Sequence, residues 1–163
     1  MPRYDVPKAA PEPLRQVQLL LNSEDQENKV DWLPDWLAER RIPDQADRAR
    51  ELRHALRALV LANNGVRLEE DALATVNEAA ARLALVLDED GRVRVQGGDP
   101  LDEVVAIALA AVLDGSWRRL KACRNCHWSF YDYSPNLSAT WCSMQLCGNR
   151  KKTRAYRARK RAA

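Results

Sequence analysis

The hydrophobic and polar positions of the first 114 residues follow the spacing of amphipathic helices. Apolar residues recur three and four positions apart, which is the repeat of one helix face. In the second such segment the apolar face carries Trp32, Trp36 and Leu37, and Pro34 is acceptable because it lies in the first turn. The pattern predicts helices over residues 14–21, 31–41, 44–63 and 69–81.

The third of these segments is the longest and has the clearest ends. Asp44 follows Pro43 and is expected to cap the helix, and the Asn-Asn-Gly sequence at 63–65 is expected to end it. One face is apolar throughout and is expected to pack against the core; it carries Ala49, Leu52, Leu56, Leu59 and Val60.

The hydrophobic period changes after residue 82. Arg and Val alternate over residues 92–95, and Asp90 with Gly91 is a sequence typical of a hairpin turn. We therefore expect a small β-hairpin with strands at about 83–88 and 92–96. A last helix is expected to begin at Asp99 or Pro100 and to reach residue 114, where Gly115 ends it. This helix is apolar on most sides, so we expect it at the centre of the core.

These elements divide the chain into three parts. Residues 1–12 are rich in proline and are expected to form a flexible arm, residues 13–116 a helical domain, and residues 117–163 a separate C-terminal module. The fold class is mainly α with one small hairpin. No apolar run approaches the ~20 residues that span a bilayer, and no apolar signal segment opens the chain, so a cytoplasmic location is expected.

Charge is distributed very unevenly along the chain. The formal net charge is only +3, but residues 117–163 hold twelve Lys and Arg against a single acid, Asp132, which leaves +11 there and −8 on the residues before. Such an asymmetry predicts a C-terminal module that binds a polyanion and a helical domain that does not.

All four cysteines lie in this basic module. Cys123, Cys126, Cys142 and Cys147 form the pattern C-x2-C-x15-C-x4-C, and two close pairs separated by a short loop are typical of a tetrahedral zinc site. Four thiolates would leave the ion no open position, so the zinc is expected to be structural, one per chain. Two disulfides and a redox-active C-x2-C pair are the alternatives. Disulfides do not suit a reducing compartment, and a redox-active pair would leave the second cysteine pair unexplained.

Other residues of the module have less specific interpretations. His127 follows Cys126 and is an alternative ligand, whereas His54 lies on a predicted helix and is expected at the surface. The aromatic residues could pack around the metal or stack on exposed bases; we expect Trp128 and Trp141 to pack and one or two of the tyrosines to be exposed.

The last residues of the chain form a basic segment with helical spacing. Ser143 is expected to cap the helix, which places Cys147 near its first turns. Beyond it, Arg150, Arg154, Arg157 and Arg161 fall on one face, and no acid follows Asp132. A solubilising or disordered tail is one interpretation; contact with nucleic-acid phosphates is the one we favour.

Several motifs of this module resemble those of the CGNR zinc finger. The segments "CRNCHWSFYDYS", "WCSMQLCGNRKK" and "RAYRARKR" carry the resemblance, and Cys147, Gly148, Asn149 and Arg150 are the four residues that give that finger its name. In that family the finger follows a helical domain called ABATE in bacterial proteins regarded as stress-induced transcriptional regulators. The resemblance implies that the four cysteines are the ligands, that the finger binds DNA and that the helical domain senses a ligand.

The loop before Trp141 is often basic in that family but reads "SPNLSAT" here, so the terminal helix would carry the DNA contacts. We expect those contacts from the signature polar pair and the basic residues that follow, namely Asn149, Arg150, Lys151, Lys152, Arg154, Arg157, Arg159, Lys160 and Arg161.

No catalytic constellation is recognisable in the sequence, so we expect a protein that is not an enzyme. The first hypothesis is a DNA-binding transcriptional regulator whose helical domain responds to a small molecule or forms a homodimer. An RNA-binding module and a zinc-finger protein-interaction adaptor are the alternatives, since basic and aromatic residues also suit single-stranded RNA and a basic tail also suits an acidic protein.

Overall fold

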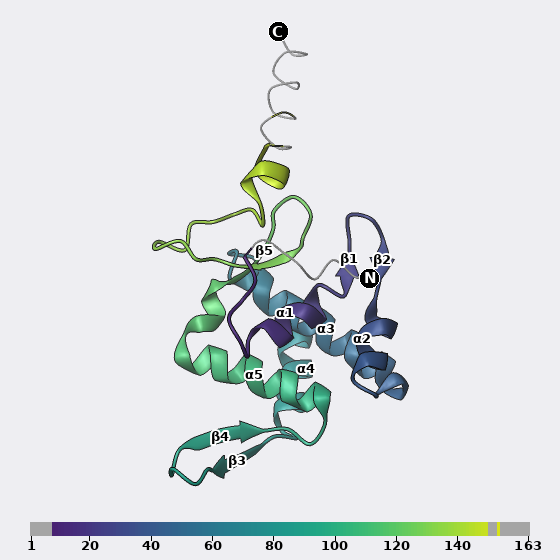
Figure 1. Ribbon diagram of the computed structural model, residues 1–163, viewed down its shortest axis with the longest axis vertical. Coiled ribbons are helices and arrows are strands. Elements are labelled where there is room, and N and C mark those ends of the chain that lie inside the picture. Colours follow the sequence, from purple (N-terminus) through teal and green to yellow (C-terminus); the bar gives the residue numbers. More distant parts are fainter. Residues whose placement is uncertain (1–7, 150–152, 154–163) are drawn as a thin grey trace.

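The computed structural model describes residues 8–149 and residue 153, and its body is helical (Figure 1). The five helices span the segments where the hydrophobic pattern predicts them. They are α1 (Arg15–Leu21), α2 (Leu33–Glu39), α3 (Ala46–Ala62), α4 (Glu70–Ala80) and α5 (Pro100–Asp114). The predicted mainly α fold class is confirmed for this part of the chain; the predicted basic terminal helix lies largely outside it.

Helix α3 lies at the centre of the helical body, where it contacts α1, α2, α4 and β5, so the predicted central position of α5 is wrong. Helix α5 packs on one side of the body against α1 and α4 (Figure 1), and its buried residues include Leu101, Val104 and Val105. Asp99 caps it by accepting hydrogen bonds from the backbone N–H groups of residues 101 and 102, and Gly115 ends it with a left-handed φ of 79°. Towards that end the apolar surface is no longer covered, since Val112 and Leu113 are exposed.

The start of α3 differs from the prediction. Asp44 does not cap the helix but lies inside a 3₁₀ turn, Pro43–Gln45, and α3 begins at Ala46 without a side-chain cap. The fixed φ of Pro43 favours the tight turn at this position, which delays the first α-helical turn.

Helix α3 also buries two arginines that its apolar pattern does not predict. Arg53 pairs with Asp31 through both guanidinium nitrogens at 2.6 and 3.0 Å, and Arg57 lies 3.2 Å from the Glu24 carboxylate. These carboxylates belong to two short antiparallel strands, β1 (Glu24–Asp25) and β2 (Val30–Asp31). The two ion pairs fasten this loop to α3.

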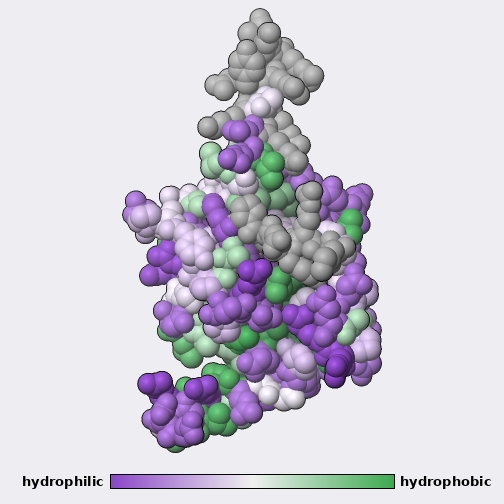
Figure 2. All heavy atoms as spheres, viewed as in Figure 1, coloured by the Kyte–Doolittle hydropathy of each residue, from purple (hydrophilic) through white to green (hydrophobic). Residues whose placement is uncertain are grey.

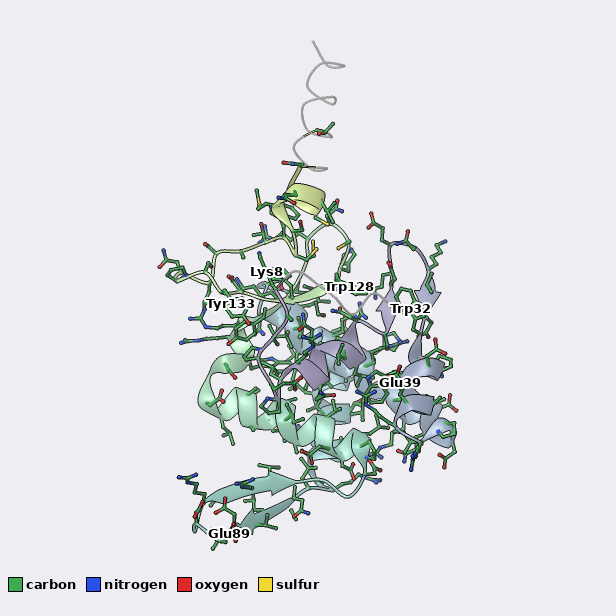
Figure 3. All side chains as sticks on the ribbon, in the orientation of Figure 1. Lys8, Trp32, Glu39, Glu89, Trp128 and Tyr133 are labelled. Atoms are coloured by element: carbon green, nitrogen blue, oxygen red, sulfur yellow. The ribbon has the colours of Figure 1, made fainter. Side chains whose placement is uncertain are left out.

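The predicted hairpin is present as β3 (Ala84–Leu87) and β4 (Val93–Gln96), paired antiparallel with Leu87 opposite Val93. It stands out from the body, with the charged tip around Glu89 at its far end (Figures 2 and 3). Leu85 and Leu87 are 75% and 71% exposed, so this hairpin contributes little to the core.

A second hairpin, which the sequence pattern does not reveal, joins the C-terminal module to the helical body. Strands β5 (Leu120–Ala122) and β6 (Ser129–Tyr131) pair antiparallel, with Leu120 opposite Tyr131. Alternate residues of a strand point to opposite faces. Leu120, Ala122 and Tyr131 accordingly complete the core of the helical body, whereas Phe130 packs with the cysteines.

Side-chain amides of α1 and of Asn22, the residue that follows it, fasten one edge of this hairpin. Asn22 pairs with the backbone of Ser129 in both directions, accepting from its N–H at 2.8 Å and donating to its carbonyl at 2.9 Å. Gln18 donates to the same carbonyl at 3.0 Å. All three residues are buried, so these hydrogen bonds are shielded from water.

Two further amides, at the end of α3, fasten the other strand. Asn63 donates to the carbonyls of Trp117 and Leu120, each at 2.8 Å. Asn64 donates to the carbonyl of Ala122 at 2.8 Å and accepts from its N–H at 3.0 Å. The Asn-Asn-Gly sequence therefore does more than end a helix, because it holds the C-terminal module by its backbone.

The described part of the predicted N-terminal arm is also held against this module. The Lys8 carbonyl accepts a hydrogen bond from the Tyr131 N–H at 2.8 Å, and the Lys8 ammonium donates to the Trp141 carbonyl at 2.8 Å. The Tyr133 hydroxyl donates to the Ala9 carbonyl at 2.7 Å, and Figure 3 shows Lys8 and Tyr133 in the same region. Residues 8–10 thus lie beside β6, held by one backbone and two side-chain hydrogen bonds, without forming a third strand.

The pairing of Asn64 with Ala122 predicts a measurable coupling between the two parts. Asn64→Ala should lower the free energy of unfolding by about 1–3 kcal/mol, because both backbone groups of Ala122 lose their partner. Urea denaturation followed by far-UV circular dichroism measures this. Asn77→Ala, which removes an exposed amide from α4, is the matched control and should change stability by less than about 0.5 kcal/mol. Equal stability of the two variants would contradict the role of Asn64.

Candidate metal centre

The first cysteine pair lies on the tight turn between β5 and β6. The N–H of Cys123 donates to the Trp128 carbonyl at 2.9 Å, and the N–H of His127 donates to the Cys123 carbonyl at 2.9 Å. This turn requires a left-handed conformation at His127, whose φ is 61°. The backbone thereby brings both sulfurs of the C-x2-C segment to one side.

The second pair is placed by a helical turn, as the sequence predicts. The Ser143 hydroxyl accepts a hydrogen bond from the Leu146 N–H at 3.3 Å and so caps the short helix Met144–Gly148. The N–H of Cys147 donates to the Ser143 carbonyl at 3.0 Å. Cys142 before the cap and Cys147 in the turn face the first pair.

The four sulfurs form one compact cluster. All of them lie within 4.8 Å of one another, and the separations of Cys126 from Cys142, of Cys142 from Cys147 and of Cys147 from Cys126 are 3.7, 3.7 and 3.5 Å. A tetrahedral ion with metal–sulfur bonds of about 2.3 Å requires about 3.8 Å between its ligands. None of the four is in a disulfide. The cluster therefore has the dimensions to hold a single four-coordinate metal ion.

The electrostatics of the cluster also favour a cation. Hydrogen bonds from Cys126 and Cys142 lower the pKa of the Cys123 thiol. The hydrogen bond to Cys123 in turn raises the pKa of Cys126 to about 12, and hydrogen bonds to Cys123 and Cys126 raise that of Cys142. The thiols can share one negative charge among themselves, and ionising the rest needs a positive charge between them.

Backbone and side-chain donors surround the sulfurs. The N–H groups of Cys126 and Cys142 point at the Cys123 sulfur, and that of Trp128 points at the Cys126 sulfur. The Asn125 amide lies 3.7 Å from the Cys147 sulfur. Such hydrogen bonds stabilise thiolates and fix their orientation towards a bound ion.

An apolar layer separates the cluster from the helical body. Phe130 is fully buried under the cysteines, and Trp128 and Trp141 are partly buried against them. The edge of Trp128 meets Trp32, at the start of α2, with the ring centres 6.5 Å apart (Figure 3). The expectation that the tryptophans pack and a tyrosine is exposed agrees with this arrangement, since Tyr133 is 61% exposed.

Gly148 is explained by close packing. A Cβ at this position would lie 3.0 Å from the Met144 sulfur and 3.4 Å from the Trp141 ring. A larger residue would require the side chain of Met144, which is 51% exposed, to shift by a few tenths of an ångström. The sequence left open a local turn or a close approach to the metal; the contact is with side chains that surround the cluster.

The one acid of the module is used inside it. Asp132 is fully buried and accepts hydrogen bonds from the Lys121 ammonium at 3.0 Å and from the backbone N–H groups of Ser134 and Ala139, each at 2.9 Å. Burial alone would disfavour the carboxylate, but the hydrogen bonds from Ser134 and Lys121 outweigh it and lower the pKa of Asp132 to about 2. Asp132 thus folds the 132–139 loop back onto β5.

The structure brings the four predicted metal ligands together, and the two histidines are not among them. His127 is exposed and serves the turn through its backbone, and His54 is exposed on α3. Asn149 is exposed and helical. The other predicted nucleic-acid contacts, Arg150, Lys151, Lys152, Arg154, Arg157, Arg159, Lys160 and Arg161, lie outside the described residues.

Sequence reasoning missed the polar residues that position the cluster. Neither Asp132 with Lys121 nor Asn64 stands in a recognised motif, because their partners are mostly backbone groups of distant residues. One signal was available: a single acid among twelve basic residues is unusual, and a carboxylate retained there suggests a buried structural role.

Two family models match this chain. Residues 17–116 match the one named ABATE, described as "Putative stress-induced transcription regulator", and residues 119–160 match the CGNR zinc finger. No curated protein matches the chain. Among the described residues, none of the helices has the length and apolar character needed to cross a membrane.

The geometry of the cluster predicts one bound metal ion per chain. Elemental analysis of the purified protein should find one equivalent, and Cys147→Ser should lower it at least tenfold because one of four ligands is lost. Ser138→Ala, an exposed change in the same module, should retain the full equivalent. Undiminished metal in the Cys147 variant would show that the ion is held elsewhere.

The burial of Asp132 predicts a pH-dependent contribution to stability. Its pKa is about 2 in the folded protein against an ordinary 3.8, so Asp132→Asn should cost about 2 kcal/mol at pH 7. Because a lowered pKa stabilises only while the carboxylate is ionised, the difference from wild type should shrink as the pH falls from about 4 towards 2.

Denaturant titrations of wild type and variant at each pH measure this difference. Protonation of the cysteines affects the stability of both proteins equally and cancels from the difference. Glu78→Gln, an exposed change on α4, is the control and should show no such pH dependence. A constant difference from pH 7 to pH 2 would contradict the assignment to the Asp132 charge.

Proposed function

Since the chain belongs to the ABATE family and ends in a CGNR zinc finger, we propose that it is a DNA-binding transcriptional regulator. In this proposal one structural zinc ion, held by Cys123, Cys126, Cys142 and Cys147, fixes the finger, and the basic residues that follow contact duplex DNA. The protein then acts by binding and not by catalysis. The family description supports the regulatory role, and the charge of the finger supports the choice of DNA.

The observation that carries the proposal is the single sign of charge on the finger. Its one acid, Asp132, is buried and paired with Lys121. Arg119 donates to the carbonyls of Asp132 and Ser134, at 2.9 and 3.1 Å. Arg118 and Arg124 are exposed, whereas no acidic side chain is exposed among the described residues of the finger.

The basic residues at the C-terminal end of the finger add to its positive charge. Residues 150–161 supply eight further Lys and Arg and no acid. With four thiolates and one Zn²⁺ counted, residues 117–163 still carry a formal charge of +9. A polyanion is the partner that such a surface attracts.

Zinc is the metal that suits this donor set best. Four thiolates in a closed tetrahedron are typical of structural zinc, and a finger of this size gains much of its folding free energy from the ion. The predicted contacts from Asn149 and from Arg150, Lys151, Lys152, Arg154, Arg157, Arg159, Lys160 and Arg161 begin directly after the last ligand. The metal thereby fixes where the basic segment starts.

The proposal assigns the helical domain to sensing. A shallow groove of about 310 Å³, largely open to solvent, lies between α3 and α4, and Glu51, His54, Glu69 and Asp71 line part of it; its volume is at the lower end of the range of small-ligand sites. A cationic or hydrogen-bonding small molecule would suit this lining. The helical domain is also joined to the finger by the buried hydrogen bond of Asn22 and the half-buried one of Asn64, which gives a bound effector a route to the DNA-binding surface.

A homodimer remains part of the proposal. The most exposed of the large apolar side chains among the described residues are Leu85 and Leu87 on β3, Val93 on β4 and Leu113 on α5. Exposed apolar strands of this kind are common at interfaces between copies. A cytoplasmic location likewise follows from the proposed function.

The experiment that tests the proposal is binding to random duplex DNA across a salt series. If about six phosphates are contacted, affinity should fall about 10³-fold between about 50 and 200 mM salt. Replacing the eight basic residues of 150–161 with Gln should remove most of this slope, and a zinc chelator should weaken binding at fixed salt. Arg67→Gln with Arg92→Gln, two exposed changes in the helical domain, is the control and should leave the slope unchanged.

The same measurement separates the alternatives. Tighter binding to single-stranded or duplex RNA of the same sequence would favour an RNA-binding module. Absence of binding to any nucleic acid would contradict the proposal and favour an adaptor that binds an acidic protein.

A further inference from the structure

Residues 8–10, here called the strap, reach the finger from the N-terminal side of the chain. The Lys8 ammonium donates a hydrogen bond to the Trp141 carbonyl at 2.8 Å, and Trp141 directly precedes Cys142. We propose that Lys8 is a positioning residue of the metal centre, which holds the second cysteine pair in place and slows the exchange of the bound ion. This inference rests on the structural zinc of the proposed function and not on its DNA contacts.

The two cysteine pairs are joined to the rest of the protein in different ways. The first pair lies on the turn of β5 and β6, whose backbone pairs with side-chain amides of the helical domain. The chain that leads to the second pair is held within the finger as far as Thr140, whose carbonyl accepts a hydrogen bond from the Arg124 N–H at 3.1 Å. Lys8 acts on the next residue, Trp141, and does so from outside the finger. The strap therefore gives the second pair an anchor similar to the one that the amides give the first.

The backbone of Lys8 has a conformation that few lysines adopt. Its φ of 75° lies in the left-handed region, which is unfavourable for a residue with a side chain. Such a conformation persists where the surroundings fix it, and it is concentrated at functional positions. Here the Lys8 carbonyl accepts hydrogen bonds from the Tyr131 N–H at 2.8 Å and from the Gln18 amide at 3.4 Å. These backbone contacts fix the point from which the ammonium reaches the finger.

The ammonium of Lys8 meets the surroundings of the metal centre at two places. Besides the Trp141 carbonyl, it contacts the face of Phe130, with 4.8 Å between the nitrogen and the ring centre. Phe130 is fully buried under the cysteines. Attraction between a cation and an aromatic face adds to the hydrogen bond. Four thiolates outweigh the charge of one Zn²⁺, so a positive charge at this place also stabilises the loaded centre.

The rest of the strap keeps the ammonium in this position. The Ala10 N–H donates to the Gln18 side chain at 2.7 Å, and the Ala9 carbonyl accepts from the Tyr133 hydroxyl at 2.7 Å. Figure 3 shows Lys8 and Tyr133 where the finger meets the helical body. Gln18 and Ala10 are buried, whereas Tyr133 is exposed, so the Tyr133 anchor can be removed without disturbing the core.

Transfer of zinc from the loaded protein to a chromogenic chelator tests the role of Lys8. Lys8→Met keeps the apolar stem but lacks the ammonium, and it should release zinc about fivefold faster because one hydrogen bond to the ligand segment is lost. Lys8→Arg retains a cation and a donor and should restore most of the slow rate. Lys29→Met is the matched control and should release zinc at the wild-type rate, since Lys29 is exposed in the loop between β1 and β2 and also has a left-handed φ, of 56°.

A second anchor shows whether the strap acts as a unit. Tyr133→Phe removes the hydroxyl that holds Ala9 and should also speed up release. If both residues act through the strap, Lys8→Met combined with Tyr133→Phe should release zinc no more than about twofold faster than Lys8→Met alone. Val105→Ala, which leaves a cavity in the helical body, separates this role from general stability. It should lower the urea midpoint more than Lys8→Met does, and yet release zinc more slowly than that variant.

Three results would overturn the inference. Release from Lys8→Met at the rate of wild type and of Lys29→Met would show that Lys8 does not position the centre. Equally fast release from Lys8→Arg and Lys8→Met would show that the cation is not responsible. Faster release from Val105→Ala than from Lys8→Met would leave Lys8 a role in general stability alone. A wild-type protein that binds no zinc would instead overturn the structural metal of the proposed function.

Discussion

The two strands β5 and β6 are the element on which both halves of this protein depend. Three residues per strand are enough because each face is fully used: Leu120, Ala122 and Tyr131 complete the helical core, and Phe130 lies under the four cysteines. Such a short ribbon is not stable by itself in water. It persists because amides of α1 and α3 pair with its backbone and because the cysteine cluster closes its turn. Metal binding and the fold of the helical body therefore contribute to the stability of one shared element.

Internal pairing also shapes the outer surface of the finger. Lys121 and Arg119 are basic, yet they bind Asp132 and carbonyls of the 132–139 loop. Two positive charges and the one negative charge of the module are thus used in internal contacts that fold this loop. What remains exposed among the described residues is positive or neutral, so a sequence that looks uniformly basic separates into structural and surface charges.

The helices could be predicted from sequence because their apolar residues repeat over several turns. The hairpin at 84–96 could be predicted for a similar local reason, since Asp90 and Gly91 mark its turn. The cysteine spacing likewise identified the residues that the fold brings within 4.8 Å. In each case the signal lies in residues close together in the chain.

Strands β5 and β6 could not be predicted, because "LKA" and "SFY" are too short to show an alternation. Their position depends on Asn22 and Asn64, more than 50 residues away, and amides that pair with backbone leave no pattern in sequence. The predicted start of α3 was wrong for a local reason, since Pro43 favours a 3₁₀ turn where an Asp cap was expected. The buried Arg53 was hidden because its partner, Asp31, belongs to a strand of two residues.

The side-chain amides that bind the backbone of β5 and β6 affect how such proteins can be rebuilt by recombination. The two family models end at residue 116 and begin at residue 119, which suggests two interchangeable cassettes. A finger separated there would include β5 and β6, but the face of these strands that packs on the helical core would be exposed. The backbone groups of Ala122 and Ser129 would lose their side-chain partners. A finger moved to another protein would therefore need a receiving surface that resembles α1 and the end of α3. Exchanging fingers between proteins requires exchanging that surface as well.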